Sequence, residues 1–474
     1  IGGMLMKAHK SIALRFLFFT TLSVLILFTC MQISFARTNT DSTDTKDKPV
    51  RISTPTSFAA DNTSEGISLS WKTNSKADGY YIYKGSKRIK TITDSATSTF
   101  LDTTSCKNAG KYTYRISAFV LNDGRRTESR ISKPLTHYYL RPVNINQAII
   151  SDFKVDMKWN INSRCDGYEI EYSTSDNFAK AKKYKTSKTS LLSDKLSASK
   201  NYYFRIRSYI TKERTTYYSS WTTSFKVVAF DSSWKYASNS KIHSTSVILY
   251  YSDAKVRHDY VVCVNAGHGT LGGESKHTYC HPDGSAKVTD GTASKGSIKT
   301  TAIATGMNFN DGTPERTANL AVAKMLKTRL LSEGYNVLMI RETDDVQLDN
   351  IARTVFANNN ANCHISIHYD STASNKGAFY TGVPNISSYR KMEPVASNWK
   401  KHESLGSSLI SGLKSSGVKI YQNGRMEVDL TQTSYSTIAS TDVELGDKCS
   451  DRSKKTLNKI TDGLVNGINI FAAR

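Results

Sequence analysis

Four acidic and imidazole side chains occur where strands end or a helix begins, and together they could bind a metal ion. His268 follows the apolar run "VVCVNA" on a Gly-His-Gly turn, His368 ends "CHISIH", and Glu444 lies in "DVELG". Glu315 follows a proline at a predicted helix start, where the helix dipole favours a carboxylate. Two imidazoles and a carboxylate suit a catalytic Zn²⁺ that keeps a fourth position for water. We therefore predict that His268, Glu315 and His368 bind zinc, and that Glu444 moves a proton from water to a leaving nitrogen.

Alternating helical and strand-like patterns from about residue 251 onwards predict an α/β domain that positions these residues. Apolar residues repeat with a helical period in "ERTANLAVAKMLKTRLLSEG", which ends in Gly334 where a C-terminal cap belongs. The strand-like segments "YNVLMIRE" and "CHISIHYD" flank a second helical segment, "LDNIARTVFANN". This alternation favours a mostly parallel sheet flanked by helices, with functional groups at the carboxyl ends of its strands.

Two copies of an all-β pattern precede this domain. Trp71 and Trp159 are 88 positions apart, and so are Asp78 and Asp166. Short alternating strands with one core Trp per copy predict one β-sandwich per copy. The pattern resembles the fibronectin type III module. That resemblance implies spacers without chemistry of their own or, as the alternative, modules that bind wall or glycan through exposed tyrosines.

The N-terminal residues indicate export. Three basic residues precede an apolar stretch over 16–35, and small residues stand at the two positions that a signal peptidase reads before a cut after Ala36. We predict a signal peptide over 1–36. If it were not cleaved, the same stretch would be an N-terminal anchor and the only membrane contact.

Composition favours an anionic partner outside the cell. Lys and Arg total 64 against 41 Asp and Glu, a formal net charge of +23. An exported protein this basic favours a polyanion such as an anionic wall polymer, and the alternative is that scattered lysines merely solvate the surface. Nucleic acid is not expected, because the sequence has no zinc-finger, RRM or basic-zipper pattern.

The predicted domains are 1–36 signal peptide or anchor, 37–51 polar linker, 52–138 and 139–230 fibronectin-like modules, 231–257 linker, and 258–474 catalytic domain.

The motifs of the last domain resemble a known family, the zinc-dependent N-acetylmuramoyl-L-alanine amidases of bacterial cell-wall lysis. The family pattern has a strand followed by GHG, a Glu that opens a helix, then "SIH" and, late in the chain, Val-Glu on a strand. The resemblance covers about residues 258–472. The matching residues, in order, are Gly267-His268-Gly269, Glu315, Asn319-Leu320, Gly334, Val337, Arg341, Asp344, Arg353, Ala357-Asn358, Ser366-Ile367-His368 and Val443-Glu444.

This resemblance implies that His268, Glu315 and His368 bind one Zn²⁺, that Glu444 is the catalytic carboxylate, and that Arg353 orders the fold. The implied reaction is hydrolysis of the amide between the lactyl group of N-acetylmuramic acid and L-alanine of the peptidoglycan stem, outside the cell or at the wall. Two alternatives stay open. One is a non-catalytic wall-binding or adhesive protein, and the other is a zinc peptidase that cuts within the stem peptide.

The sequence departs from the compact family pattern in the segment 270–314. We expect this insertion to line the substrate groove, with a surface loop as the alternative. It contains Glu274, a competitor to Glu315 as a ligand, and Cys280-His281, a weaker candidate for a second metal site. Glu315 is preferred because only its downstream helix matches the family.

Overall fold

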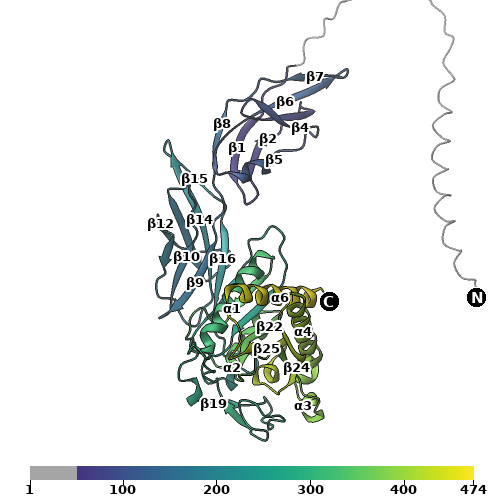
Figure 1. Ribbon diagram of the computed structural model, residues 1–474. Coiled ribbons are helices and arrows are strands. Elements are labelled where there is room, and N and C mark those ends of the chain that lie inside the picture. The colour runs from purple at the N-terminus through teal and green to yellow at the C-terminus, as the bar shows by residue number, and fades with distance from the viewer. Residues whose placement is uncertain (1–50, 474) are drawn as a thin grey trace, which may run out of the picture. The chain divides into compact units, whose positions relative to one another are not determined.

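The computed structural model describes residues 51–473, which form two β-sandwiches followed by an α/β domain (Figure 1). The predicted signal peptide lies outside the described residues, as does nearly all of the predicted linker 37–51. Among the helices of the described chain, none is both long and apolar enough to cross a membrane.

The first sandwich packs a three-stranded sheet against a five-stranded sheet. Trp71 and Tyr80 come from opposite sheets, and their rings meet edge to face with centroids 5.4 Å apart. The strands are β1 (Thr56–Asn62), β2 (Ile67–Lys72), β3 (Gly79–Lys84), β4 (Lys87–Ile92), β5 (Thr99–Asp102), β6 (Gly110–Asn122), β7 (Arg125–Glu128) and β8 (Leu135–Tyr139), with a 3₁₀ turn η1 (Thr103–Lys107).

The second sandwich repeats the core contacts of the first. Trp159 and Tyr168 also meet edge to face at 5.4 Å. The backbone N–H of Asn162 donates to the Tyr168 hydroxyl, as that of Asn74 does to Tyr80. The contacts thus recur at the spacing of the sequence repeat, and the fibronectin type III assignment stays a prediction. The strands are β9 (Ile145–Ser151), β10 (Lys154–Trp159), β11 (Gly167–Ser173), β12 (Lys182–Thr186), β13 (Ser190–Leu192), β14 (Tyr202–Lys212), β15 (Thr215–Tyr218) and β16 (Thr222–Val228).

The α/β domain alternates strands with helices, as the sequence pattern indicates. The strands are β17 (Val247–Tyr250), β18 (Val261–Ala266), β19 (His277–Tyr279), β20 (Lys299–Thr301), β21 (Asn336–Met339), β22 (Cys363–Asp370), β23 (Ala378–Gly382), β24 (Ile420–Glu427) and β25 (Ala439–Asp447). The helices are α1 (Glu315–Ser332), α2 (Asn350–Asn360), α3 (Ser387–Lys391), α4 (Val395–Ser415), α5 (Thr431–Tyr435) and α6 (Lys454–Ala472), with 3₁₀ turns η2 (Ala237–Asn239) and η3 (Gly273–Ser275).

The main sheet of this domain is mixed, so the prediction of a mostly parallel sheet is wrong. In the order β17-β21-β18-β22-β25-β23-β24, β18 is parallel to β21 and β22, and β25 is parallel to β22. In contrast, β17 is antiparallel to β21, and β23 is antiparallel to β25. Parallel strands need a crossover of roughly a dozen residues or more, usually through a helix. The connections 251–260 and 371–377 are short and contain no helix, so the chain returns in the opposite direction.

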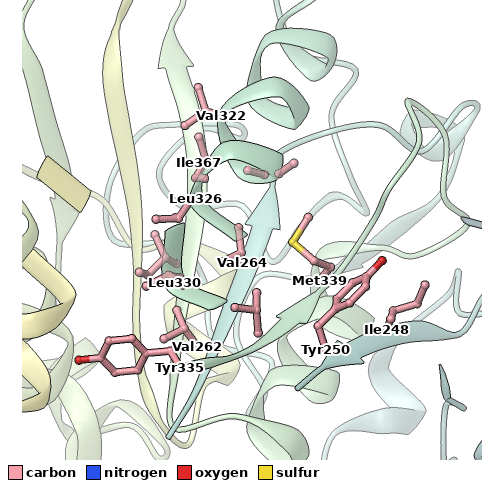
Figure 2. Close-up of a cluster of buried hydrophobic side chains, with 14 of the residues drawn as sticks. Ile248, Tyr250, Val262, Val264, Val322, Leu326, Leu330, Tyr335, Met339 and Ile367 are labelled. Atoms are coloured by element: carbon pink, nitrogen blue, oxygen red, sulfur yellow. The ribbon is translucent and has the colours of Figure 1, made fainter. Parts of the chain in front are cut away.

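Strand β17 joins this sheet to the second sandwich, although it lies in the segment 231–257 that we expected to be a linker. It pairs antiparallel with β16 on one side and with β21 on the other. The backbone N–H of Ala148 in β9 donates to the hydroxyl of Tyr250, whose ring lies 4.2 Å from Nζ of Lys327 in α1. Figure 2 shows Ile248 and Tyr250 of β17 beside Met339 of β21. The second sandwich and the α/β domain therefore share one hydrophobic core.

Helices cover both faces of the sheet because its side chains alternate between them. Val264 of β18 packs toward Leu326 of α1 (Figure 2), whereas the adjacent Cys263 packs with Phe356 of α2. Helix α6 contacts both α1 and α4, and these three helices cover one face of the sheet, whereas α2 covers the other. This packing fixes the positions of β18, β22 and β25, from which the candidate site is built.

Candidate metal centre

His268, Glu315 and His368 bring their donor atoms to one point. Nε2 of His268 lies 3.0 Å from Oε2 of Glu315, and Nδ1 of His368 lies 3.1 Å from Oε1 of Glu315. The two imidazole nitrogens are 3.1 Å apart. Tetrahedral ligands at about 2.0–2.2 Å from Zn²⁺ are roughly 3.3–3.6 Å apart, so a triangle with sides of 3.0 and 3.1 Å is slightly tighter than the ideal one but close to the size that holds one such ion. The donor set and its dimensions fit zinc.

The Gly-His-Gly turn has a specific backbone conformation. His268 has φ of 61° and Gly269 has φ of 78°, both in the left-handed region that side chains with a β-carbon disfavour. A β-carbon on Gly267 would lie 2.1 Å from the ring of His368. The first glycine therefore makes room for the second imidazole, and the last glycine allows the turn.

Two buried guanidinium groups hold this turn. Arg353 is fully buried and donates to the carbonyl oxygens of Ala266 and His268. Arg341 is also buried and donates to the carbonyl oxygens of Ala266 and Gly267. These contacts lie behind the turn, as we expected of an arginine that orders the fold.

Glu315 is the first residue of α1 and is held by three donors. The backbone N–H of Met307 donates to its Oε2 at 3.1 Å. Its Oε1 accepts from the side chain of Asn319 and from the backbone N–H of Tyr369, each at 3.1 Å. Burial raises the pKa of Glu315, but the hydrogen bonds and charges of His268 and His368 outweigh burial and hold the pKa far below its usual range. The ligand candidate is thus a fixed carboxylate.

Each histidine ring is oriented through the nitrogen that faces away from the triangle. Nδ1 of His268 lies 2.8 Å from the carbonyl oxygen of Ala304, and Nε2 of His368 lies 3.1 Å from Oγ of Ser366. Such outer contacts fix the ring and its tautomer in metal-binding histidines. Ala304 and Met307 both belong to the insertion 270–314, which therefore braces two of the three predicted ligands through its backbone.

Glu444 lies beside His368, and a further carboxylate, Asp442, accompanies it. Ligand atoms of His368, Asp442 and Glu444 lie within 4.8 Å of one another. Burial, followed by the charge of Asp442, raises the pKa of Glu444 well above its usual range. Burial lowers the pKa of His368, but the charges of Asp442 and Glu315 raise it to about 10. This concentration of negative charge favours a bound cation.

The side chain of Glu444 also has an unused oxygen. Its Oε2 is buried without a hydrogen-bond partner among the described residues.

We did not predict Asp442 from the sequence, although strand alternation in "DVE" places it on the same face of β25 as Glu444.

The competing candidates lie elsewhere. Glu274 is exposed in η3, and the described residues form two groups that could hold a metal ion, neither of which contains it. Cys280 and His281 are buried outside both groups, and Nε2 of His281 lies 3.1 Å from Oδ2 of Asp429. The structure therefore brings together the four residues predicted from the strand ends and the helix start.

Comparison with known proteins identifies the class of the α/β domain. Residues 262–469 match the family model described as N-acetylmuramoyl-L-alanine amidase. The chain therefore carries an N-acetylmuramoyl-L-alanine amidase domain, and enzymes of this class hydrolyse peptidoglycan. No curated protein matches the sequence.

Solved structures similar to the chain include amidases from two bacteria. The N-acetylmuramyl-L-alanine amidase Ami1 from Mycobacterium smegmatis is 17% identical, with a TM-score of 0.38, and the match covers 46% of this chain and 98% of that one. The N-acetylmuramoyl-L-alanine amidase AmiC2 of Nostoc punctiforme is 15% identical, with a TM-score of 0.33, over 46% of this chain and 100% of that one.

Proposed function

We propose that the amidase domain uses one Zn²⁺, held by His268, Glu315 and His368, to hydrolyse the amide between N-acetylmuramic acid and L-alanine. The observation that carries this proposal is the triangle of donor atoms with sides of 3.0 and 3.1 Å. When bound, the zinc ion supplies Lewis acidity, which lowers the pKa of a water molecule and polarises the amide carbonyl.

In this proposal Glu444 transfers the proton. It accepts a proton from the attacking water and returns it to the amide nitrogen as the C–N bond breaks, which leaves a lactyl carboxylate and the free amine of L-alanine. Its Oε2 is available for this role, because it makes no hydrogen bond to any of the described residues.

We also propose that the enzyme acts outside the cell or at the wall. The predicted signal peptide and the formal charge of +23 support this location, because anionic wall polymers attract a basic protein. The basic chain and the two sandwiches would then keep the amidase domain near its substrate.

The test is digestion of purified peptidoglycan by the full chain, with mass spectrometry of the released fragments. We expect stem peptides that begin with L-alanine from the wild type, and none from Glu444→Gln or from chelator-treated protein. Glu274→Gln is the matched control, because this exposed glutamate lies outside the donor triangle. Peptides cut within the stem would support the peptidase alternative. Intact walls that retain the wild type would support the wall-binding alternative.

A further inference from the structure

Asp442 occupies a position at the candidate centre that the proposed chemistry does not yet use. It precedes Glu444 by two residues on β25, so both side chains project from the same face of the strand. In the parallel pairing of β22 with β25, Asp442 is in register with Ser366, and Glu444 is in register with His368. The carboxyl group of Asp442 is largely buried, and its Oδ1 has no hydrogen-bond partner in the described part of the chain.

The carboxylate of Asp442 faces the outer nitrogen of His368. Because Nδ1 of His368 points at Glu315, a neutral ring that binds metal through Nδ1 carries its proton on Nε2. That Nε2 has two oxygen neighbours, Oγ of Ser366 at 3.1 Å and Oδ2 of Asp442 at 3.6 Å. A carboxylate beside the outer N–H of a metal-binding histidine fixes the tautomer and makes the inner nitrogen a stronger ligand.

The two predicted histidine ligands differ in this respect. Nδ1 of His268 lies 2.8 Å from the neutral carbonyl oxygen of Ala304. Only His368 has a carboxylate, that of Asp442, at its outer nitrogen. The strength of this second imidazole as a ligand therefore depends on a residue that is not itself part of the donor triangle.

We propose that Asp442 is a positioning residue of the zinc site: Ser366 accepts the Nε2–H of His368, and the negative charge of Asp442 beside that N–H fixes the tautomer and strengthens Nδ1 as a ligand. This inference rests on the proposed zinc site. Asp442 acts through His368 and takes no direct part in proton transfer, which is assigned to Glu444.

The test measures zinc affinity of the full chain by competition with a chromophoric chelator, together with zinc stoichiometry and the thermal midpoint of the zinc-free protein. Asp442→Asn keeps the shape of the side chain and removes its charge. We expect this variant to bind one zinc ion roughly 10–100-fold more weakly than the wild type, the usual effect of losing an outer partner of a ligand. The zinc-free midpoint should change far less than zinc affinity, because the substitution keeps the shape of the side chain and removes both its attraction to His368 and its repulsion from Glu444.

Asp370→Asn is the matched control, because Asp370 lies two residues after His368 but pairs with Lys376 at 3.0 Å. It should bind zinc as the wild type does. Unchanged zinc affinity in Asp442→Asn would overturn the inference. A loss in the free energy of unfolding of the zinc-free protein as large as the loss in zinc-binding free energy would also overturn it, because that result indicates a purely structural role. Binding of a second zinc ion by the wild type that is absent in Asp442→Asn would overturn it as well. If the wild type itself bound no zinc, the proposed zinc site would fail, whatever Asp442 does.

Discussion

Asp429 anchors the insertion that braces the donor triangle, so its substitution tests whether the insertion is a fixed part of the site. Asp429 lies in the loop that connects β24 to α5, and its side chain is buried. Its Oδ1 accepts from Nζ of Lys287 at 2.7 Å, and its Oδ2 lies 3.1 Å from Nε2 of His281. Further along the insertion, Ala304 contacts His268. Asp429→Ala should therefore loosen the insertion and, through Ala304, the orientation of His268.

The magnitude follows from the burial of the partners. Lys287 is only 6% exposed, so Asp429→Ala leaves a buried ammonium without its carboxylate. Removing one partner of a buried ion pair costs about 3–5 kcal/mol. Lys287 also donates to the backbone oxygen of residue 429, which the substitution keeps, so we expect the lower end of this range.

The effect should depend on pH in one direction. Burial raises the pKa of Asp429, but hydrogen bonds from His281, Lys287 and Thr289 outweigh burial and lower the pKa well below its usual range. A carboxyl group whose pKa is lower in the folded state stabilises the fold above its unfolded pKa of about 3.9. That stabilisation is lost as the pH falls toward the lower, folded pKa. The difference between wild type and Asp429→Ala should therefore be full at pH 7 and shrink in acid.

Hydrogen exchange of the amides in β19 and β20 measures the free energy of local opening of the insertion. We expect faster exchange in Asp429→Ala. In the double variant Asp429→Ala/Lys287→Met, which also removes the unpaired ammonium group, the exchange rates should return part of the way to those of the wild type. Asp290→Asn, an exposed acidic residue in the same insertion, is the control and should exchange as the wild type does. A change below about 1 kcal/mol at pH 7, or no recovery in the double variant, would refute the reasoning.

Two further predictions concern the turn and the shared sheet. In Gly267→Ala the new β-carbon would lie 2.1 Å from the His368 ring, so zinc affinity should fall at least tenfold; equal affinity by chelator competition would contradict the geometry. A fragment of residues 251–474 lacks β17 and exposes the edge of β21, so it should unfold at a lower temperature and aggregate more than a fragment of residues 139–474. Equal thermal midpoints and equal solubility would show that the second sandwich does not support the amidase domain.

Local sequence patterns predicted much of the site because its residues stand at element ends. The pattern of "PERTANL" places Glu315 at a helix start, and α1 begins at that residue. The apolar run before the Gly-His-Gly turn forms β18, which ends two residues before His268. These features depend on turn chemistry and hydrophobic periodicity within a few residues, and such signals can be read from one sequence.

The arrangement of the sheet was harder to predict because it depends on which strands become neighbours. The four residues of β17 are too short to stand out as a strand, yet they complete the sheet between β16 and β21. Strand β23 follows β22 after a short loop but pairs with β25. Connection length constrains strand direction, but the choice of neighbour depends on packing between distant segments, which local patterns do not contain.

The outer contacts of the site show a different limit of prediction. Ala304 and Met307 contribute through backbone atoms, so their side chains give no signal in the sequence. Asp442, in contrast, had a signal, because the alternation in "DVE" sets it on the same face as Glu444.

The Gly-His-Gly turn combines both kinds of information. From the sequence alone, its two glycines suggest a tight turn and room for substrate beside the metal. Gly269 fits the first reason, with φ of 78°, but the space beside Gly267 is filled by the ring of His368. The first glycine is thus required by a residue 101 positions later in the chain, because β18 and β22 are parallel neighbours whose ends meet. A donor triangle this small can form only where the backbone before His268 carries no side chain.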